Sequence, residues 1–264
     1  MSGASTEAFR AEAFKPARPV LLPRAAFLSP ERKFPAINNW FIYDTRANKW
    51  ELNNAYLEPH GDALVPLELT SRDPSTGLAS FQRVDAAPLA LFLGWASLYS
   101  SSPSQAAESP LYLAQHHIDA LPALLQHDLP TPSIVMHAGA GDMYGSSIWL
   151  GPATSYTPLH RDPNPNLFVQ MAGRKAVRLF SPSAGRGIFS ADAGNHNMRG
   201  QEMMAGAERV RLEEAVWGDR GSEEAEGLEA CLESGDALFI PTGWWHSFKG
   251  VGEGITGSVN WWFR

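Results

Sequence analysis

The second half of the chain is divided into short apolar segments by turn-forming residues. From about Pro132 onward, stretches rich in β-branched and aromatic residues alternate with Gly, Pro, Asn and Asp, which is typical of many short strands. A chain of 264 residues, 44% of them hydrophobic, can bury one large core. We therefore predict a mainly β fold with flanking helices, in the form of a β-sandwich or a jelly roll (double-stranded β-helix). The expected strands are SSIWLG, NLFVQM, KAVRLF, DALFIP and ITGSVNWWF.

We expect residues 1–264 to form a single domain with three parts. Residues 1–24 read as a flexible leader, residues 25–130 as a mixed α/β elaboration, and residues 131–264 as the jelly-roll core. The core is interrupted by residues 183–230, which read as a long insert or loop between two strands. The elements expected in the elaboration are a strand at Asp62–Thr70 and helices at Ala86–Ser97 and Ile118–His127.

Composition excludes several classes of protein. Cys231 is the single cysteine, so a disulfide framework and a cysteine-rich zinc site are excluded, and we expect an intracellular protein of the cytoplasm or nucleus. No segment approaches the roughly 18 to 20 apolar residues of a membrane span. The net charge of −7 arises between Glu213 and Glu233, which holds eight acidic residues and one basic residue. The remainder is balanced, so we expect no stable nucleic-acid binding. The acidic run is interpreted as a solvated insert, with attraction of a basic peptide as the alternative.

Lys175 occupies an unusual position within an expected strand. Alternation in KAVRLF places it on the same face as Val177 and Leu179. Burying an ammonium group is costly unless an anion pairs with it. No acidic residue of the sequence is an obvious partner, which leaves room for the carboxylate of a ligand. The alternative is a lysine at a strand start whose side chain extends to solvent.

Three further residues have the chemistry of metal ligands. His160 and Asp162 are two residues apart in an extended segment, so their side chains lie on the same side. His246, which follows DALFIPTGWW, is a candidate for a third ligand. Two histidines and one carboxylate leave open positions on an octahedral ion, the arrangement of non-haem Fe(II) oxygenases. A His-x-Asp pair alone is a weak signal, and a structural role is its alternative.

In combination these motifs are specific. TPLHRDPNPNLFVQMAGRK, GDALFIPTGWWHSF and ITGSVNWWF together resemble the catalytic core of the JmjC-domain 2-oxoglutarate oxygenases, over roughly Leu111 to the C-terminus. The resemblance implies a cupin-like jelly roll. Within that family the chain is most similar to the protein hydroxylases. The segments LYLAQHH and VPLELTSR resemble the arginyl hydroxylase and lysine demethylase 8 group, whereas Asn260, where that group carries Ser, resembles the asparaginyl hydroxylase of hypoxia-inducible factor.

The resemblance implies a role for each matching residue. His160, Asp162 and His246 would bind Fe(II), and Lys175 would pair with the distal carboxylate of 2-oxoglutarate. O2 would be the second cosubstrate, and succinate and CO2 would be products. The other implied cosubstrate contacts are Thr157 and Tyr112 beside Lys175, and Asn166 and Asn260 near the metal-bound end; the implied substrate contacts are Glu68, Gln115 and Trp149.

The leading functional hypothesis is hydroxylation of a C–H bond of a protein side chain, arginyl or similar. Alternatives on the same scaffold are N-methyl-lysine demethylation and hydroxylation of a small molecule or a tRNA base. A non-catalytic cupin-like binding protein is the alternative from a different class. We expect a protein or peptide substrate and a monomer, because the chain stops at Arg264 directly after the last expected strand. Glu68 has its own alternative, since an internal arginine would satisfy a buried glutamate as well as a substrate one.

Overall fold

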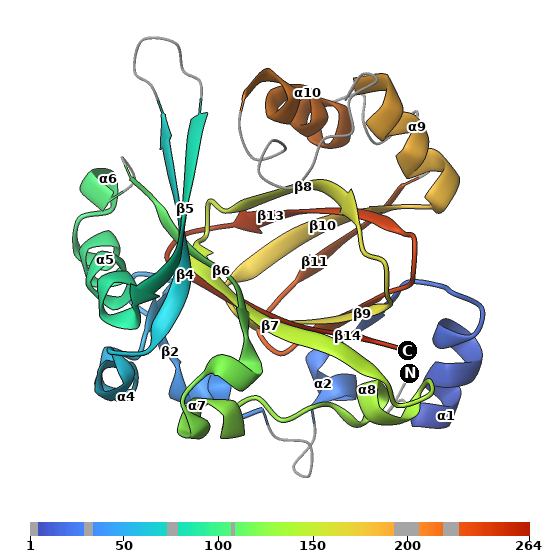
Figure 1. Ribbon diagram of the computed structural model, residues 1–264, viewed down its shortest axis with the longest axis horizontal. Coiled ribbons are helices and arrows are strands. Elements are labelled where there is room, and N and C mark those ends of the chain that lie inside the picture. Colours follow the sequence, from blue (N-terminus) through green and yellow to red (C-terminus); the bar gives the residue numbers. More distant parts are fainter. Residues whose placement is uncertain (1–4, 29–33, 73–78, 107–108, 193–205, 219–226) are drawn as a thin grey trace.

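The structure is a computed structural model that describes residues 5–28, 34–72, 79–106, 109–192, 206–218 and 227–264. Figure 1 shows two β-sheets facing one another, with helices around the outside. One sheet has eight strands in the order β1-β12-β9-β14-β7-β6-β4-β5, and the other has four in the order β11-β10-β13-β8. The strands within each sheet pair antiparallel. The predicted mainly β fold with flanking helices is confirmed.

The jelly-roll strands lie where the sequence predicted them. The five strands expected from their residue pattern are all present, as β7, β9, β10, β12 and β14. Along β10 the expected face is also confirmed, because Lys175, Val177 and Leu179 are buried. The bounds are β7 (Met143–Pro152), β8 (Tyr156–Arg161), β9 (Asn166–Ala172), β10 (Arg174–Phe180), β11 (Gly227–Leu232), β12 (Ala237–Ile240), β13 (Trp245–Val251) and β14 (Ile255–Phe263).

Residues 5–24, which we expected to belong to a flexible leader, are packed onto the core instead. They form α1 (Thr6–Phe9), a π-helical turn (Arg10–Phe14) and β1 (Val20–Leu22), which pairs with β12. Phe9 is only 1% exposed and its ring meets Phe239 edge-on, while Phe14 stacks on Phe263. The apolar residues of this segment provide the reason, since burying aromatic rings outweighs the entropy of a free tail. Residues 1–4 lie outside the described part.

The elaboration before the jelly roll contains the expected strand, β4 (Leu64–Arg72), paired with β5 (Ala79–Pro88). The first expected helix begins later than predicted, because its first residues belong to β5; α5 spans Leu89–Ser101. The second is broken into a 3₁₀ turn (Ile118–Ala120) and α7 (Ala123–His127), because Pro122 between them cannot donate a helical hydrogen bond. The other elements are α2 (Arg24–Phe27), α3 (Ala36–Asn39), β2 (Phe41–Asp44), β3 (Lys49–Leu52), α4 (Asn54–Leu57), a 3₁₀ turn (Glu58–His60), α6 (Pro103–Ala106), β6 (Leu111–His117) and α8 (Ser133–His137).

The segment 183–230, expected as a long insert or loop, is largely built of regular elements. It contains most of α9 (Pro182–Asp192), all of α10 (Gly206–Trp217) and part of β11, the edge strand of the four-stranded sheet. Two of its acidic residues make ion pairs with the sheet, at 2.9 Å between Glu213 and Lys249 and at 2.7 Å between Glu229 and Arg178. These two residues therefore lie in regular elements and not in a loop, although the side chain of Glu229 is 55% exposed and remains solvated as expected. Residues 193–205 and 219–226 lie outside the described part.

Two apolar clusters leave room for a site between the sheets. The larger core lies behind the eight-stranded sheet and includes Phe92, Leu113 and Trp261. A smaller cluster, which includes Val177, Leu179 and Leu238, fills one side of the space between the sheets. The other side of this space is lined by polar residues of β8, β13, β14 and β6. Among the described residues, no helix has the length and apolar character needed to cross a membrane.

Candidate metal centre

The structure brings the three predicted metal ligands together. His160 lies on β8 and Asp162 directly follows that strand, while His246 lies opposite His160 on the neighbouring strand β13. One donor atom from each of the three residues lies within 4.8 Å of the others. The two imidazole rings are 4.2 Å apart between centroids, and His246 Nε2 is 3.7 Å from Asp162 Oδ2. Strand pairing therefore converts a motif and a distant histidine into one cluster.

Backbone carbonyls fix the orientation of both imidazoles. Nδ1 of His160 lies 2.9 Å from the carbonyl oxygen of Pro158, and Nδ1 of His246 lies 3.2 Å from that of Trp244. Because a carbonyl oxygen only accepts, each Nδ1 carries the proton and each Nε2 presents a lone pair. Burial, and after it the proximity of His160, lowers the pKa of His246 to about 4. Both effects favour the neutral imidazole, which is the form that binds metals.

A bulge in β8 explains how His160 and Thr157 share one face. The two residues are three apart, so in a regular strand they would point to opposite faces. Pairing shifts between β8 and β13: His160 lies opposite His246, whereas Thr157 lies opposite Phe248. One extra residue of β8 is thereby accommodated, and both side chains line the same cavity. The hydroxyl of Ser247, opposite the bulge, donates to the Thr157 carbonyl at 2.7 Å.

Lys175 lies inside the same cavity and is 3% exposed. Its Nζ donates to the hydroxyls of Ser258 at 3.1 Å and Tyr112 at 3.3 Å, and it lies over the rings of Tyr112 and Phe168. Among the described residues it makes no ion pair, and burial lowers its pKa to about 7. The alternative of a lysine reaching solvent is therefore wrong. A cation that is buried with two hydroxyls and no carboxylate among the described residues is chemically suited to an anionic ligand.

One cavity joins the metal ligands to Lys175. The other predicted cosubstrate contacts, Tyr112, Thr157, Asn166 and Asn260, all line this cavity. Gly151 permits the ring of Tyr112 to lie across β7, because a Cβ at that position would clash with the ring. The cavity is lined by Tyr112, Trp149, Thr157, His160, Asp162, Asn166, Phe168, Lys175, His246, Phe248, Ser258, Asn260 and Trp262.

The two asparagines hold neighbouring groups in place. Asn166 donates its Nδ2 to Asp162 Oδ2 at 2.9 Å, and Asn260 accepts from Trp149 Nε1 at 2.9 Å. Asn166 Oδ1 is buried and has no hydrogen-bond partner among the described residues, so it is available to a donor in the cavity. Ser258 was not among the residues predicted from the sequence. Alternation along β14 contained the signal, because residues 258, 260 and 262 share the face that lines the cavity.

The three residues expected to face a substrate have different positions. Trp149 lines the cavity, whereas Glu68 and Gln115 do not. Glu68 Oε1 accepts from Arg83 Nη1 at 2.8 Å, which is the internal arginine foreseen as the alternative. Gln115 has a left-handed φ of 54° and lies where β6 shifts register against β7. Such a bulge redirects side chains beside a site.

The donor set fits a particular kind of metal. Two Nε2 atoms with fixed tautomers and one carboxylate, itself held by Asn166, form the 2-His-1-carboxylate arrangement of non-haem Fe(II) sites. Because the single cysteine, Cys231, is exposed and outside the cluster, thiolate ligation is excluded. His160, Asp162 and His246 therefore fit Fe(II).

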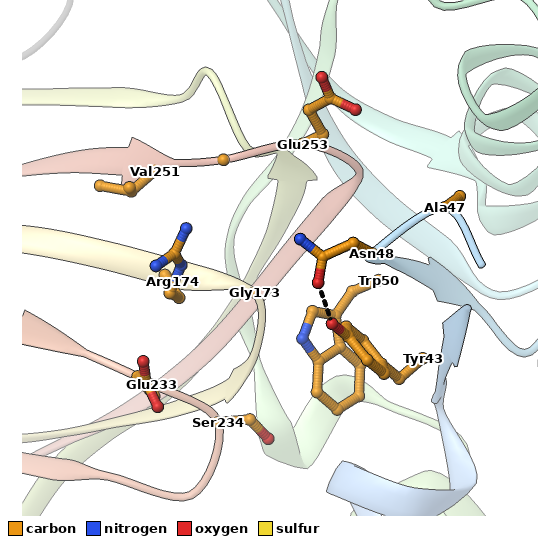
Figure 2. A pocket seen from close by; sticks show the side chains of 11 residues that line it. Tyr43, Ala47, Asn48, Trp50, Gly173, Arg174, Glu233, Ser234, Val251 and Glu253 are labelled. Atoms are coloured by element: carbon orange, nitrogen blue, oxygen red, sulfur yellow. Dashed lines mark hydrogen bonds between the residues drawn. The ribbon is translucent and has the colours of Figure 1, made fainter. Parts of the chain in front are cut away.

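A second cavity, of about 720 Å³, lies at the hairpin turns on the outside of the jelly roll. Figure 2 shows Arg174 and Glu233 on one side and Tyr43, Asn48 and Trp50 of the β2–β3 hairpin on the other. The hydroxyl of Tyr43 donates to the side chain of Asn48. This groove is open and polar, and it contains none of the clustered metal ligands. The candidate metal centre is therefore the one in the interior cavity.

Comparison with known proteins gives a consistent result. The cupin-like domain family matches residues 8–264. Lysine-specific demethylase JMJ30 of Arabidopsis thaliana is 26% identical, over 99% of this chain and 53% of the relative. Jumonji C domain-containing protein 5 of Drosophila melanogaster is 27% identical, over 98% and 58%. Lysine-specific demethylase 8 of Danio rerio is 31% identical, over 58% and 36%. The chain spans about half the length of the first two relatives. The resemblance noted in the motifs is confirmed, and the chain belongs to the cupin-like JmjC domain family.

Proposed function

We propose that this protein is an Fe(II)- and 2-oxoglutarate-dependent oxygenase that hydroxylates a C–H bond of a protein side chain. One observation carries the proposal: a cluster of two histidines and an aspartate shares a cavity with a buried lysine that has no carboxylate partner among the described residues. The cluster suits a metal and the lysine suits the far end of a dicarboxylic acid. The two requirements together match 2-oxoglutarate better than a monoanion.

The residues of the cavity have separate tasks in this proposal. Fe(II), when bound, supplies the activation of O2 that couples decarboxylation of 2-oxoglutarate, to succinate and CO2, to hydroxylation of the substrate. His160, Asp162 and His246 hold the metal. Lys175, with the hydroxyls of Tyr112 and Thr157, binds the distal carboxylate through charge-assisted hydrogen bonds. Asn166 and Asn260 would also contact the cosubstrate, as the motifs imply, and Ser258 would support it because it contacts Lys175.

The proposal is tested by binding before turnover. 2-Oxoglutarate is titrated anaerobically into the Mn(II)-loaded protein, with calorimetry as the readout. We expect binding that requires the metal and is lost in His246→Ala and in Lys175→Ala. A folded wild-type protein that binds no 2-oxoglutarate would refute the oxygenase and leave a cupin-like protein with another ligand. Metal-dependent binding without succinate formation, for any protein substrate supplied, would favour a non-catalytic binding protein.

For the substrate we propose a protein side chain, arginyl or similar, in the cytoplasm or nucleus, and we retain the prediction of a monomer. Glu68 supports this class, because it is a partly buried carboxylate on β4 directly opposite Tyr112, whose side chain lines the cavity. Trp149 would form a wall for the substrate, and Gln115 would contact it from the bulge of β6. A mass-spectrometric screen of arginine-containing peptides tests this assignment. One added oxygen on an arginine residue is the expected product.

N-methyl-lysine demethylation is the second candidate, because two of the relatives are named lysine-specific demethylases. Hydroxylation of a methyl group there gives an unstable hemiaminal that releases formaldehyde. The same screen separates the two reactions when methylated lysine peptides are included. Loss of a methyl group with formaldehyde release would indicate demethylation, whereas a retained oxygen on the peptide would indicate stable hydroxylation.

A further inference from the structure

A row of three side chains leads from the edge of the larger sheet to the cavity. Arg83 on β5 lies opposite Glu68 on β4, and Glu68 lies opposite Tyr112 on β6. Residues directly opposite one another across paired strands have their side chains on the same face. Tyr112 lines the cavity, and its hydroxyl accepts a hydrogen bond from Lys175 Nζ. The row therefore connects an edge strand to the wall of the site, and Figure 1 shows the β4–β5 hairpin projecting from the body of the molecule.

The ion pair between Arg83 and Glu68 uses only one hydrogen bond of those that the guanidinium and the carboxylate can make. Glu68 has a side chain that is 13% exposed, and burial raises its pKa, so the carboxylate requires a cation nearby. Its Oε1 accepts from Arg83 Nη1 at 2.8 Å, whereas its Oε2 accepts no hydrogen bond from any described residue. The pair is therefore a single-point contact. A carboxylate that receives two parallel N–H bonds from one guanidinium is bound more strongly.

Arg83 has a second carboxylate to hold it. Its Nε donates to Asp85 Oδ1 at 3.1 Å, and the side chain of Asp85 is 90% exposed. Arg83 can leave Glu68 while it keeps this contact in solvent. Glu68, in contrast, is left with an uncompensated charge in a partly buried position unless another cation arrives.

We propose that Arg83 is a displaceable occupant of Glu68, and that a guanidinium side chain of the substrate takes its place on that carboxylate. The inference rests on the proposed function, since it assumes that the substrate enters the cavity beside Tyr112. It makes Arg83 a specificity-determining residue. A substrate guanidinium can use both oxygens of Glu68 and so offsets the loss of the single Arg83 contact, whereas a neutral side chain of similar shape cannot.

The test measures peptide binding to the complete protein loaded with Mn(II) and 2-oxoglutarate under anaerobic conditions. The probe is a short glycine peptide with one central arginine, and the matched probe carries citrulline, which has the same shape without the charge. We expect Arg83→Gln to bind the arginine peptide about three- to fivefold more tightly than wild type, the range set by loss of a competing, partly exposed ion pair. Affinity for the citrulline peptide should not change.

Two further variants separate competition at Glu68 from a general change of charge. In a Glu68→Gln background, Arg83→Gln should not increase the affinity for the arginine peptide. If Arg83→Gln acted only by removing a positive charge, it would still increase that affinity in the Glu68→Gln background. Asp85→Asn should weaken binding of the arginine peptide when Arg83 is present and should have no effect in Arg83→Gln, because only the displaced Arg83 needs Asp85. A purely structural ion pair predicts neither coupling.

The outcomes also separate this inference from the proposed function. Unchanged or weaker binding of the arginine peptide by Arg83→Gln, or no binding to any of the variants, overturns the inference if Lys175-dependent binding of 2-oxoglutarate is intact in the same samples. If the wild-type protein does not bind 2-oxoglutarate, the proposed oxygenase function itself is refuted. Chemical denaturation of each variant shows whether the ion pair also contributes to folding.

Discussion

Arg174 and Lys175 are neighbours in the sequence, and neither makes an ion pair with a described residue, yet they lie in different surroundings. They point to opposite faces of β10. Lys175 is 3% exposed in the interior cavity, and Arg174 is exposed in the groove at the hairpin turns, where Figure 2 shows it among polar neighbours. In the groove water solvates the guanidinium, so the unpaired charge costs little.

In the interior, the same lack of a partner has a different consequence. An ammonium group taken out of water loses its hydration, and two hydroxyls replace only part of it. The depressed pKa of Lys175 expresses that cost. An anionic ligand would restore a full partner. An unpaired cation that is buried is therefore stabilised by an anionic ligand, whereas an exposed cation is already stabilised by water.

The largest expected difference between the two cavities concerns the metal. Asp162→Ala removes one of three clustered ligands, so we expect Mn(II) affinity to fall by more than about a hundredfold. Glu233→Ala deletes a carboxylate from the groove and should leave Mn(II) affinity unchanged. Electron paramagnetic resonance of free Mn(II) measures both. Equal losses in the two variants would contradict the placement of the metal in the interior.

The next effect concerns the two neighbouring cations. Lys175→Met should reduce the affinity for 2-oxoglutarate by about a hundredfold, because it removes one member of a buried charge pair. Arg174→Met removes the same charge one residue away on the other face and should change the affinity by less than about twofold. Calorimetry on the Mn(II)-loaded proteins gives both values. A large loss in Arg174→Met would show that the groove takes part in cosubstrate binding.

The pH dependence of stability sharpens the same contrast. Lys175 has a folded pKa of about 7 against an ordinary value of 10.5. Below about pH 7 both the folded and the unfolded chain carry the proton, so its destabilising effect is constant. Above that pH the unfolded state binds more protons, and the free energy of unfolding should rise by about 2 kcal/mol between pH 7 and 9. Urea unfolding without 2-oxoglutarate measures this rise as the difference between wild type and Lys175→Met. No difference between them would contradict a depressed pKa.

The smallest effect concerns the hydroxyl that supports Lys175. Ser258→Ala removes one hydrogen bond from its Nζ, so 2-oxoglutarate should bind roughly three- to tenfold more weakly in the variant. Ser234→Ala removes a hydroxyl that lines the groove and serves as the matched control, with no expected change. If the two variants bind 2-oxoglutarate equally well, Ser258 has no part in its recognition.

Much of this site was predictable from local patterns. The period of two in KAVRLF placed Lys175 on the buried face, and the spacing of His160 and Asp162 placed their side chains together. His246 was a candidate third ligand because it follows a strand and a turn, and the resemblance to the JmjC family supported that assignment. The prediction of one helix over residues 118–127 was wrong because Pro122 interrupts it. The prediction of a flexible leader was wrong because Phe9 and Phe14 pack into the core.

By itself, therefore, the sequence determined the mainly β fold, the face of β10 that carries Lys175 and the chemical types of the candidate ligands, because these follow from residue pattern and short spacing. Only the tertiary structure decided which carbonyls orient the two imidazoles, how a bulge brings Thr157 onto the face of His160, and that Arg83 occupies Glu68. The physical reason is register. Alternation along a strand is local, whereas the partner opposite each residue depends on strands that are distant in the chain and on the bulges that shift their pairing.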